Sequence, residues 1–213
     1  MTLTHFRPHP VRGPFNALFF WVTGGLFDRM LGPHKRRLLV DLPDTVVELG
    51  SGVGANLRYL EPGTTLIAVE PNPAMHGRLR RAARRRGVAL DVRPVAAERT
   101  DLPDASADVV ISSLVLCSVS DPHQVLAEVR RVLRPGGRFV FVEHVAAPDG
   151  TALRRLQRWV RRPWAWCFEG CSCERDLAAA LRSAGFEDVD VEPYRLRSPF
   201  LPFNPQIAGV ATA

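Results

Sequence analysis

The sequence predicts a single α/β domain built on a doubly wound, mostly parallel sheet. Three observations predict this fold class. Short β-branched apolar runs alternate with amphipathic stretches from residue 45 onward, which is typical of parallel strands joined by helices. A glycine-rich turn directly follows the first apolar run. The length of 213 residues suits one domain with its own hydrophobic core.

Residues 1–40 are expected to form an N-terminal arm and lid helices, ahead of a main domain over 41–213. The prolines within residues 1–14 predict a poorly ordered arm. Residues 15–40 predict one or two helices, with a break at Gly32-Pro33 because proline interrupts a helix.

The most apolar early segment, Phe15–Phe27, is interrupted by Thr23-Gly24-Gly25. No stretch of the chain reaches the roughly 20 apolar residues that a membrane-spanning helix needs. The segment also lacks the small-residue cleavage site of a signal peptide. We therefore expect an amphipathic lid helix whose contact with a membrane is at most peripheral.

The main domain is expected to alternate strands and helices. Apolar runs bounded by proline or glycine predict strands, and amphipathic stretches between a capping residue and a glycine predict helices. Asp121-Pro122, for example, is an N-cap followed by proline at the first helical position. The expected order is a strand at 45–49, a strand at 65–70, a helix at 74–86, strands at 89–95 and 108–112, a helix from 122 that includes Leu133 and ends at Pro135-Gly136-Gly137, a strand at 138–145, helices within 151–168 and 173–184, and a closing antiparallel pair at 189–191 and 207–211.

This alternation implies right-handed crossovers and a parallel sheet that is covered on both faces. Ligands of such sheets bind outside the carboxyl ends of the strands, at the point where the strand order reverses. The residues that directly follow the strands are therefore the candidates for chemistry.

The first strand leads into a glycine-rich turn, Glu48-Leu49-Gly50-Ser51-Gly52-Val53-Gly54. Glycines permit close approach of a ligand to the backbone, and the helix expected next would point its N-terminus at that ligand. The spacing E-x-G-x-G-x-G differs from the dinucleotide fingerprint G-x-G-x-x-G, which disfavours a nicotinamide cofactor. An acid ahead of the glycines favours a ligand that carries an ammonium and a sulfonium. A tight turn without a ligand is the simpler alternative.

Glu70 follows the second strand, where a carboxylate can accept hydrogen bonds from both hydroxyls of a ribose. A solvated acid at a strand end is the alternative. Together with the glycine turn, Glu70 favours a nucleoside ligand.

Three segments, residues 47–54, 70–73 and 131–137, resemble class I S-adenosylmethionine (SAM)-dependent methyltransferases. The resemblance covers about residues 44–146. It implies a Rossmann-like sheet of seven strands in the order 3-2-1-4-5-7-6 with strand 7 antiparallel. It also implies SAM as the methyl donor and S-adenosylhomocysteine as the product.

Further segments are similar to the methyltransferase-like proteins that methylate alkyl thiols, and they extend the resemblance over most of residues 45–213. That similarity implies S-methylation of a small thiol. Methylation of oxygen, nitrogen or carbon on another small molecule or a phospholipid head group remains the alternative, and so does a binding protein without catalysis. The segments are Gly54-Ala55-Asn56, residues 114–119, residues 143–147, residues 168–171 and residues 205–209.

The resemblance also implies a set of cofactor-binding residues. One position departs from it, because Ala96 stands where many class I enzymes place an aspartate that holds the adenine amino group. The backbone N–H of Ala97 and the carboxylate of Glu98 can take over that contact. The expected cofactor-binding residues are Glu48, Gly50, Ser51, Gly52, Gly54, Asn56, Glu70, Pro71, Asn72, Ala97, Glu98 and Leu114.

The residues after the fourth and fifth strands are candidates for the acceptor side. His144 is the candidate proton acceptor, because an imidazole titrates near neutral pH; a hydrogen-bonded histidine that only shapes the pocket is the favoured alternative. Cys117 is expected to line the acceptor pocket or to be a small apolar filler. Trp164, with Trp159, Trp166 and Phe168, forms either an apolar wall over the acceptor or part of the core.

The remaining expectations concern metal, compartment and partners. Cys167, Cys171 and Cys173 match no familiar zinc module, so no metal is expected even with His144 nearby. The cysteines show no disulfide framework, which predicts free thiols and a cytoplasmic protein. The net charge is +6, but the arginines of residues 78–86 suit a solvated helix face and no basic module is added. We therefore expect a small-molecule acceptor and no nucleic acid, with the oligomeric state left open.

Overall fold

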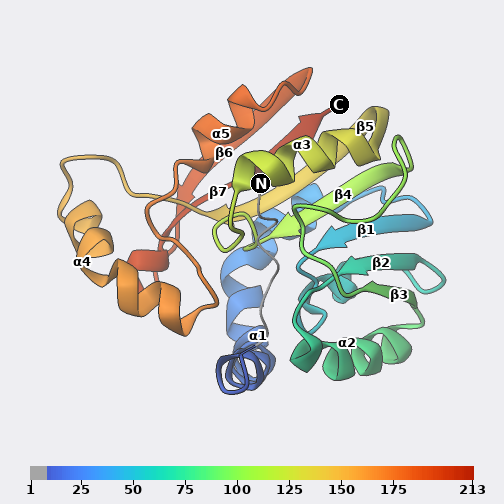
Figure 1. Ribbon diagram of the computed structural model, residues 1–213, viewed down its shortest axis with the longest axis horizontal. Coiled ribbons are helices and arrows are strands. Elements are labelled where there is room, and N and C mark those ends of the chain that lie inside the picture. The colour runs from blue at the N-terminus through green and yellow to red at the C-terminus, as the bar shows by residue number, and fades with distance from the viewer. Residues whose placement is uncertain (1–8) are drawn as a thin grey trace.

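A computed structural model describes residues 9–213 of the protein (Figure 1). Seven strands form one sheet in the order β3-β2-β1-β4-β5-β7-β6. Strands β1 to β5 run parallel, and β7 is antiparallel to both β5 and β6. The predicted fold class and strand order are therefore confirmed. The strands are β1 Thr45–Leu49, β2 Thr65–Val69, β3 Ala89–Arg93, β4 Ala107–Ser113, β5 Leu133–His144, β6 Asp188–Arg195 and β7 Pro205–Thr212.

Helices cover both faces of this sheet. Alternate residues of each strand point to opposite faces, so Val46 packs with α2 and the end of α1, whereas Val47 packs with α3 and α5. Figure 1 shows these two layers, with α4 set out beyond the sheet and beside η2. The helices are α1 Arg12–Leu38, η1 Ala55–Tyr59, α2 Pro73–Arg86, α3 Pro122–Val132, α4 Ala152–Cys167, α5 Leu177–Ser183 and η2 Leu201–Phe203.

The prediction of a helix break at Gly32-Pro33 is wrong, because α1 continues through both residues. Leu31 and Lys35 are buried on either side of the proline. Burial of this helix face outweighs the backbone hydrogen bond that Pro33 removes.

The predicted arm is also wrong in part, since α1 begins at Arg12. Pro14 lies in the first turn of the helix, where a missing N–H costs nothing. Residues 1–8 lie outside the described part of the chain. The division into residues 1–40 and 41–213 stays a prediction, and α1 packs against α2, η1, β5 and β7.

Two further elements differ from the sequence prediction. The glycine turn leads into the short 3-10 helix η1 and not into an α-helix, because the turn at Pro62 and Gly63 leaves few residues before β2. Strand β5 already begins at Leu133, which was expected in the preceding helix. Leu133 pairs with Ala107 across a bulge, so the proline–glycine segment lies within the strand and not before it.

Among residues 9–213, no helix combines the length and the apolar character needed to cross a membrane. The predicted solvent exposure of the arginine-rich helix is confirmed for most of its members. Arg80, Arg81, Arg84, Arg85 and Arg86 are exposed on α2.

We expect Gly209→Ala to lower the free energy of unfolding by about 2 kcal/mol or more, the cost of overpacking a core. Gly209 lies in β7 between β5 and β6. A Cβ atom there would stand 1.9 Å from the carbonyl oxygen of Asp190 and 2.9 Å from the ring of Phe141. Urea denaturation measures the change.

The matched control is Gly77→Ala in α2, where a Cβ atom meets nothing within 4 Å. This variant should be as stable as the wild type or up to about 1 kcal/mol more stable, because alanine favours a helix. Equal stability of the two variants would contradict the described packing of β7.

Candidate active site

A cavity of about 500 Å³ lies where β1, β2 and β4 end and the order of the sheet reverses. This volume is typical of sites for small molecules and cofactors. Its two ends differ in character. The glycine turn and several polar side chains line one end, and aromatic side chains from α1, α4 and the η2 region line the other.

The glycine turn between β1 and η1 has a backbone that requires glycine. Gly50 and Gly52 both lie in the left-handed region, with φ of 55° and 54°. A Cβ atom on Gly50 would stand 2.5 Å from Val115, so this position is closed by packing. A Cβ atom on Gly52 would meet nothing closer than 3.8 Å, so this backbone is open to the cavity.

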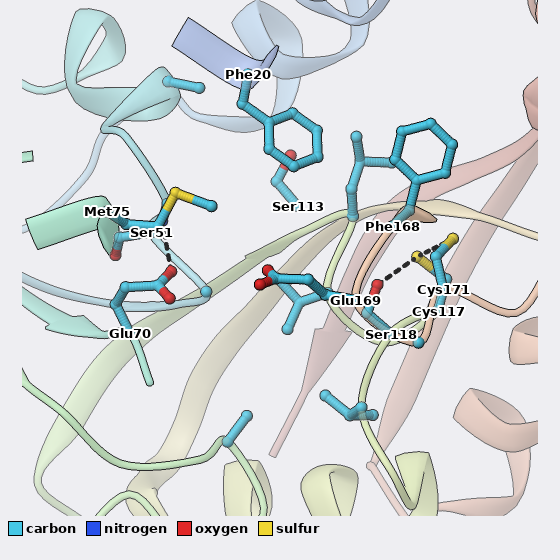
Figure 2. A pocket seen from close by; sticks show the side chains of 18 of the residues that line it. Phe20, Ser51, Glu70, Met75, Ser113, Cys117, Ser118, Phe168, Glu169 and Cys171 are labelled. Atoms are coloured by element: carbon cyan, nitrogen blue, oxygen red, sulfur yellow. Dashed lines mark hydrogen bonds between the residues drawn. The ribbon is translucent and has the colours of Figure 1, made fainter. Parts of the chain in front are cut away.

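Glu70 follows β2 and is only 5% exposed. The backbone N–H of Gly52 donates to its Oε2 at 2.7 Å, and the N–H of Asn72 donates to its Oε1 at 2.8 Å. Each carboxylate oxygen can accept one more hydrogen bond, and Glu70 lines the cavity. Burial raises the pKa of Glu70 to about 7, and the two N–H donors oppose that rise. Figure 2 shows the carboxylate directed toward the turn at Ser51.

Glu48, Asn56 and Lys35 form a buried hydrogen-bonded chain along the cavity wall. The Lys35 ammonium donates to Asn56 Oδ1 at 2.8 Å, and Asn56 Nδ2 donates to Glu48 Oε1 at 2.6 Å. Oε2 of Glu48 is buried without a partner. Burial lowers the pKa of Lys35 to about 8 and raises the pKa of Glu48. An acidic and a basic side chain, bridged by Asn56, therefore lie at this end of the cavity.

Sequence reasoning missed Lys35. The one available signal was composition, because Lys35 is the only lysine in a chain that otherwise uses arginine. The residue belongs to α1, outside the strand and the glycine turn, so only packing brings it to Asn56 and, through Asn56, to Glu48.

Of the expected cofactor-binding residues, all but Gly54 and Asn72 line the cavity. Gly54 lies against Leu57 and Leu79, where a Cβ atom would not fit. Asn72 caps α2 and donates to the carboxylate of Glu169. These two residues therefore belong to the structure around the cavity and not to its lining.

The aromatic end of the cavity includes the predicted Trp164 and Phe168. Trp159 and Trp166, which were expected in the same wall, point away from it and are 82% and 61% exposed. That part of the prediction is wrong, because helical spacing places these side chains on the outer face of α4. Phe19, Phe20, Phe27, Phe200 and Phe203 complete the aromatic end.

Cys117 and Cys171 lie together at this end, with their sulfur atoms 3.5 Å apart (Figure 2). The hydrogen bond between the two sulfurs holds the pKa of Cys171 well below its ordinary value and raises that of Cys117. The indole N–H of Trp164 donates to the Cys171 sulfur at 3.3 Å. The two thiols come from segments after β4 and α4, so no sequence spacing pairs them.

His144 is buried and does not line the cavity. Its Nε2 donates to the carbonyl of Pro202 at 2.8 Å, and its Nδ1 lies 3.6 Å from the sulfur of Cys171. Cys171 therefore stands between the imidazole and the cavity. The other two cysteines of the predicted run lie outside this group: the Cys173 thiol donates to the Gln157 carbonyl, and Cys167 has intermediate burial.

Residues 47–141 match the family of methyltransferase domains. The chain is 38% identical to the rat thiol S-methyltransferase TMT1B, over 83% of this chain and 77% of that protein. It is 32% identical to the human thiol S-methyltransferase TMT1A, over 87% of this chain and 81% of that protein. The chain belongs to this family of SAM-dependent methyltransferases.

Solved structures agree with the fold of this methyltransferase. The [4+2]-cyclase SpnF superposes with a TM-score of 0.68 at 20% identity, covering 87% of this chain and 80% of that one. An S-adenosylmethionine-dependent methyltransferase from Mesorhizobium loti superposes with a TM-score of 0.58 at 22% identity, covering 83% and 96%. The predicted fold and enzyme class are confirmed.

We expect SAM binding by this methyltransferase to strengthen as the pH rises from 5.5 to 7, by about tenfold or more. Glu70 has a pKa of about 7 when no ligand is bound, so below pH 7 it is mostly protonated. Ribose hydroxyls would donate hydrogen bonds to the carboxylate form of Glu70, so binding at this residue should release its proton. Titration calorimetry across this pH range measures the change.

The control is Glu70→Gln, which keeps the shape of the side chain and cannot titrate. Its affinity should be lower above pH 7, and its pH dependence should be weaker than that of the wild type. Lys35 stays charged over this range because its pKa is about 8. Identical pH profiles for the two proteins would contradict the assignment.

Proposed function

We propose that this methyltransferase transfers the methyl group of SAM to the sulfur of a small apolar thiol. The observation that carries this proposal is the single cavity with a polar end and an aromatic end. A nucleoside and an apolar acceptor can occupy the two ends at once, so that the reacting atoms meet in between. The names of the relatives, thiol S-methyltransferases of rat and human, support sulfur as the acceptor atom.

The polar end fits SAM by the chemistry of its side chains. Glu70 offers a free lone pair on each oxygen to the two ribose hydroxyls. The unpartnered Oε2 of Glu48 and the Lys35 ammonium suit the ammonium and the carboxylate of the methionine end. This pairing of opposite charges matches a zwitterion.

The part of the cavity that would hold the adenine is lined by Ala96, Ala97 and Glu98. It is less polar than in many class I enzymes, because Ala96 stands in place of the usual aspartate. Glu98 accepts a hydrogen bond from the backbone N–H of Ser120, which fixes the carboxylate at the edge of the cavity. We assign the adenine contact to the N–H of Ala97 and to this carboxylate.

SAM supplies a methyl group on a sulfonium, which a thiolate displaces in line. The protein therefore needs to align the acceptor and exclude water more than it needs to activate the methyl group. Phe19, Phe27, Trp164 and Phe168 surround the aromatic end and provide this exclusion. His144 contacts Cys171 and does not line the cavity, so we assign it as a positioning residue for Cys171 and not as the proton acceptor.

The outer face of α1 supports peripheral contact with a membrane surface. Its large apolar side chains are exposed, and they lie on the helix whose inner aromatic residues line the cavity. An apolar acceptor dissolved in a membrane surface would reach the cavity past this helix. The cysteines are free, which fits a cytoplasmic location. The exposed residues are Phe15, Leu18, Trp21, Val22 and Leu26.

A panel of acceptors with labelled SAM tests the proposed reaction. Small alkyl or aryl thiols should accept the label, and phenols or amines of similar size and shape should accept at least about 100-fold less, because methyl transfer needs the anionic sulfur nucleophile. Mass spectrometry identifies the labelled atom. Transfer of label only to oxygen, nitrogen or carbon would reject the thiol acceptor.

Gly52→Arg and Glu70→Ala should each abolish SAM binding in calorimetry. The arginine would fill the open side of the glycine turn, and the alanine would remove the ribose acceptor. Arg85→Ala, at an exposed site on α2, is the control that should bind as the wild type does. Unchanged affinity in both site variants would rule out this cavity as the SAM site.

A further inference from the structure

Three potential metal ligands meet beneath the aromatic end of the cavity. They are Cys117, His144 and Cys171, which follow or end β4, β5 and α4. All three side chains are buried, and their ligand atoms lie within 4.8 Å of one another. The sequence run of Cys167, Cys171 and Cys173 predicted no such group, because two of its members lie elsewhere.

The distances match those between ligands of a tetrahedral zinc ion. Zinc–sulfur bonds of about 2.3 Å and zinc–nitrogen bonds of about 2.0–2.1 Å place neighbouring ligand atoms roughly 3.5–3.8 Å apart. The two sulfurs are 3.5 Å apart, and Cys171 Sγ lies 3.6 Å from His144 Nδ1. Two of the three spacings therefore fit ligands of one zinc ion, and the third pair, Cys117 and His144, lies within 4.8 Å.

The surroundings hold these ligand atoms in place. His144 Nε2 and Gln157 Nε2 both donate to the carbonyl of Pro202, at 2.8 and 2.9 Å. This contact puts the imidazole proton on Nε2 and leaves the lone pair of Nδ1 free to bind a cation. The indole N–H of Trp164 donates to Cys171, as donors near zinc thiolates commonly do. Metal-bound histidines generally have a second partner of this kind.

The cluster offers three ligands, and no fourth belongs to it among residues 9–213. Both cysteines line the cavity, whereas His144 lies behind them. The remaining position of a tetrahedral ion would therefore face the cavity. Three protein ligands with one open position are typical of catalytic zinc, and structural zinc has four protein ligands.

We propose that Cys117, His144 and Cys171 form a zinc site whose open position takes the sulfur of the acceptor thiol. This inference rests on the proposed thiol acceptor. The acceptor displaces a water from zinc, forms a sulfur–zinc bond and gives its S–H proton to solvent water. Zinc keeps the sulfur deprotonated and close to the methyl group.

The transfer then balances without a redox step. A lone pair of the bound sulfur forms a bond to the methyl carbon. The bond between that carbon and the sulfonium breaks, and its electron pair stays on the departing sulfur. The neutral thioether product binds zinc more weakly than a thiolate does and leaves, and water takes its place.

Zinc content tests the site without any methyl transfer. Protein purified without chelators and given one equivalent of zinc should hold about one zinc per chain, as a three-ligand site does. Cys117→Ser and Cys171→Ser should each lose most of it, and Cys167→Ser, which removes a thiol outside the cluster, should keep it. Elemental analysis after desalting measures the content, and circular dichroism verifies the fold of each variant.

X-ray absorption at the zinc edge of the wild type tests the open position, and it stays informative if a cysteine variant fails to fold. Without SAM, the expected shell is two sulfurs, one nitrogen and one oxygen. Adding a small alkyl thiol should change it to three sulfurs and one nitrogen. The absorption spectrum reports the zinc ligands and does not depend on methyl transfer. The experiment therefore distinguishes failure of the zinc proposal from failure of the proposed thiol methylation.

Three outcomes would overturn the proposal. The first is a wild type that retains less than about a tenth of an equivalent of zinc, which is far below a specific site. The second is zinc that remains in the folded Cys171→Ser variant or a shell that does not change with thiol. The third is a Cys117–Cys171 disulfide in protein kept under reducing conditions, because a disulfide leaves no thiolate to bind zinc.

Discussion

The hydrogen bonds to the Glu70 carboxylate are the constraint on which the rest of the site depends. One oxygen accepts from Gly52 in the turn after β1, and the other accepts from Asn72 at the start of α2. The Glu70 side chain thereby joins the turn after β1 to the start of α2 at the edge of the sheet. Both hydrogen bonds are needed because Glu70 is buried, and a carboxylate removed from water costs free energy unless donors replace the water. Glu70 also lines the cavity, so the carboxylate that joins these two segments is available to donor groups of a ligand.

The two ends of the cavity arise from different parts of the chain. The sheet supplies the polar end, where residues after neighbouring strands converge by topology. The aromatic end comes from α1, α4 and η2, which pack across the opening. The polar end, formed by the sheet, and the aromatic end, formed by the peripheral helices, can therefore vary independently. This division explains why the fold agrees with structures near 20% identity, while the thiol assignment depends on closer relatives.

Sequence reasoning predicted the elements whose signals are local. The glycine turn and Glu70 directly follow apolar strands, so their positions in the chain fix their positions in space. Features created by long-range packing were missed. Lys35 reaches Asn56, and through it Glu48, only because α1 continues through Pro33. Cys117 meets Cys171 only where two loops fold together. The tryptophans of α4 divide between the cavity and solvent, which composition alone cannot resolve.

We propose above all that Glu70 and the glycine turn hold the nucleoside. A crystal structure with S-adenosylhomocysteine tests it most directly. We expect both ribose hydroxyls within hydrogen-bonding distance of the Glu70 oxygens, with the amino acid end between Glu48 and Lys35. A nucleoside bound elsewhere, with the Glu70 carboxylate still facing an empty cavity, would rule out this role of Glu70.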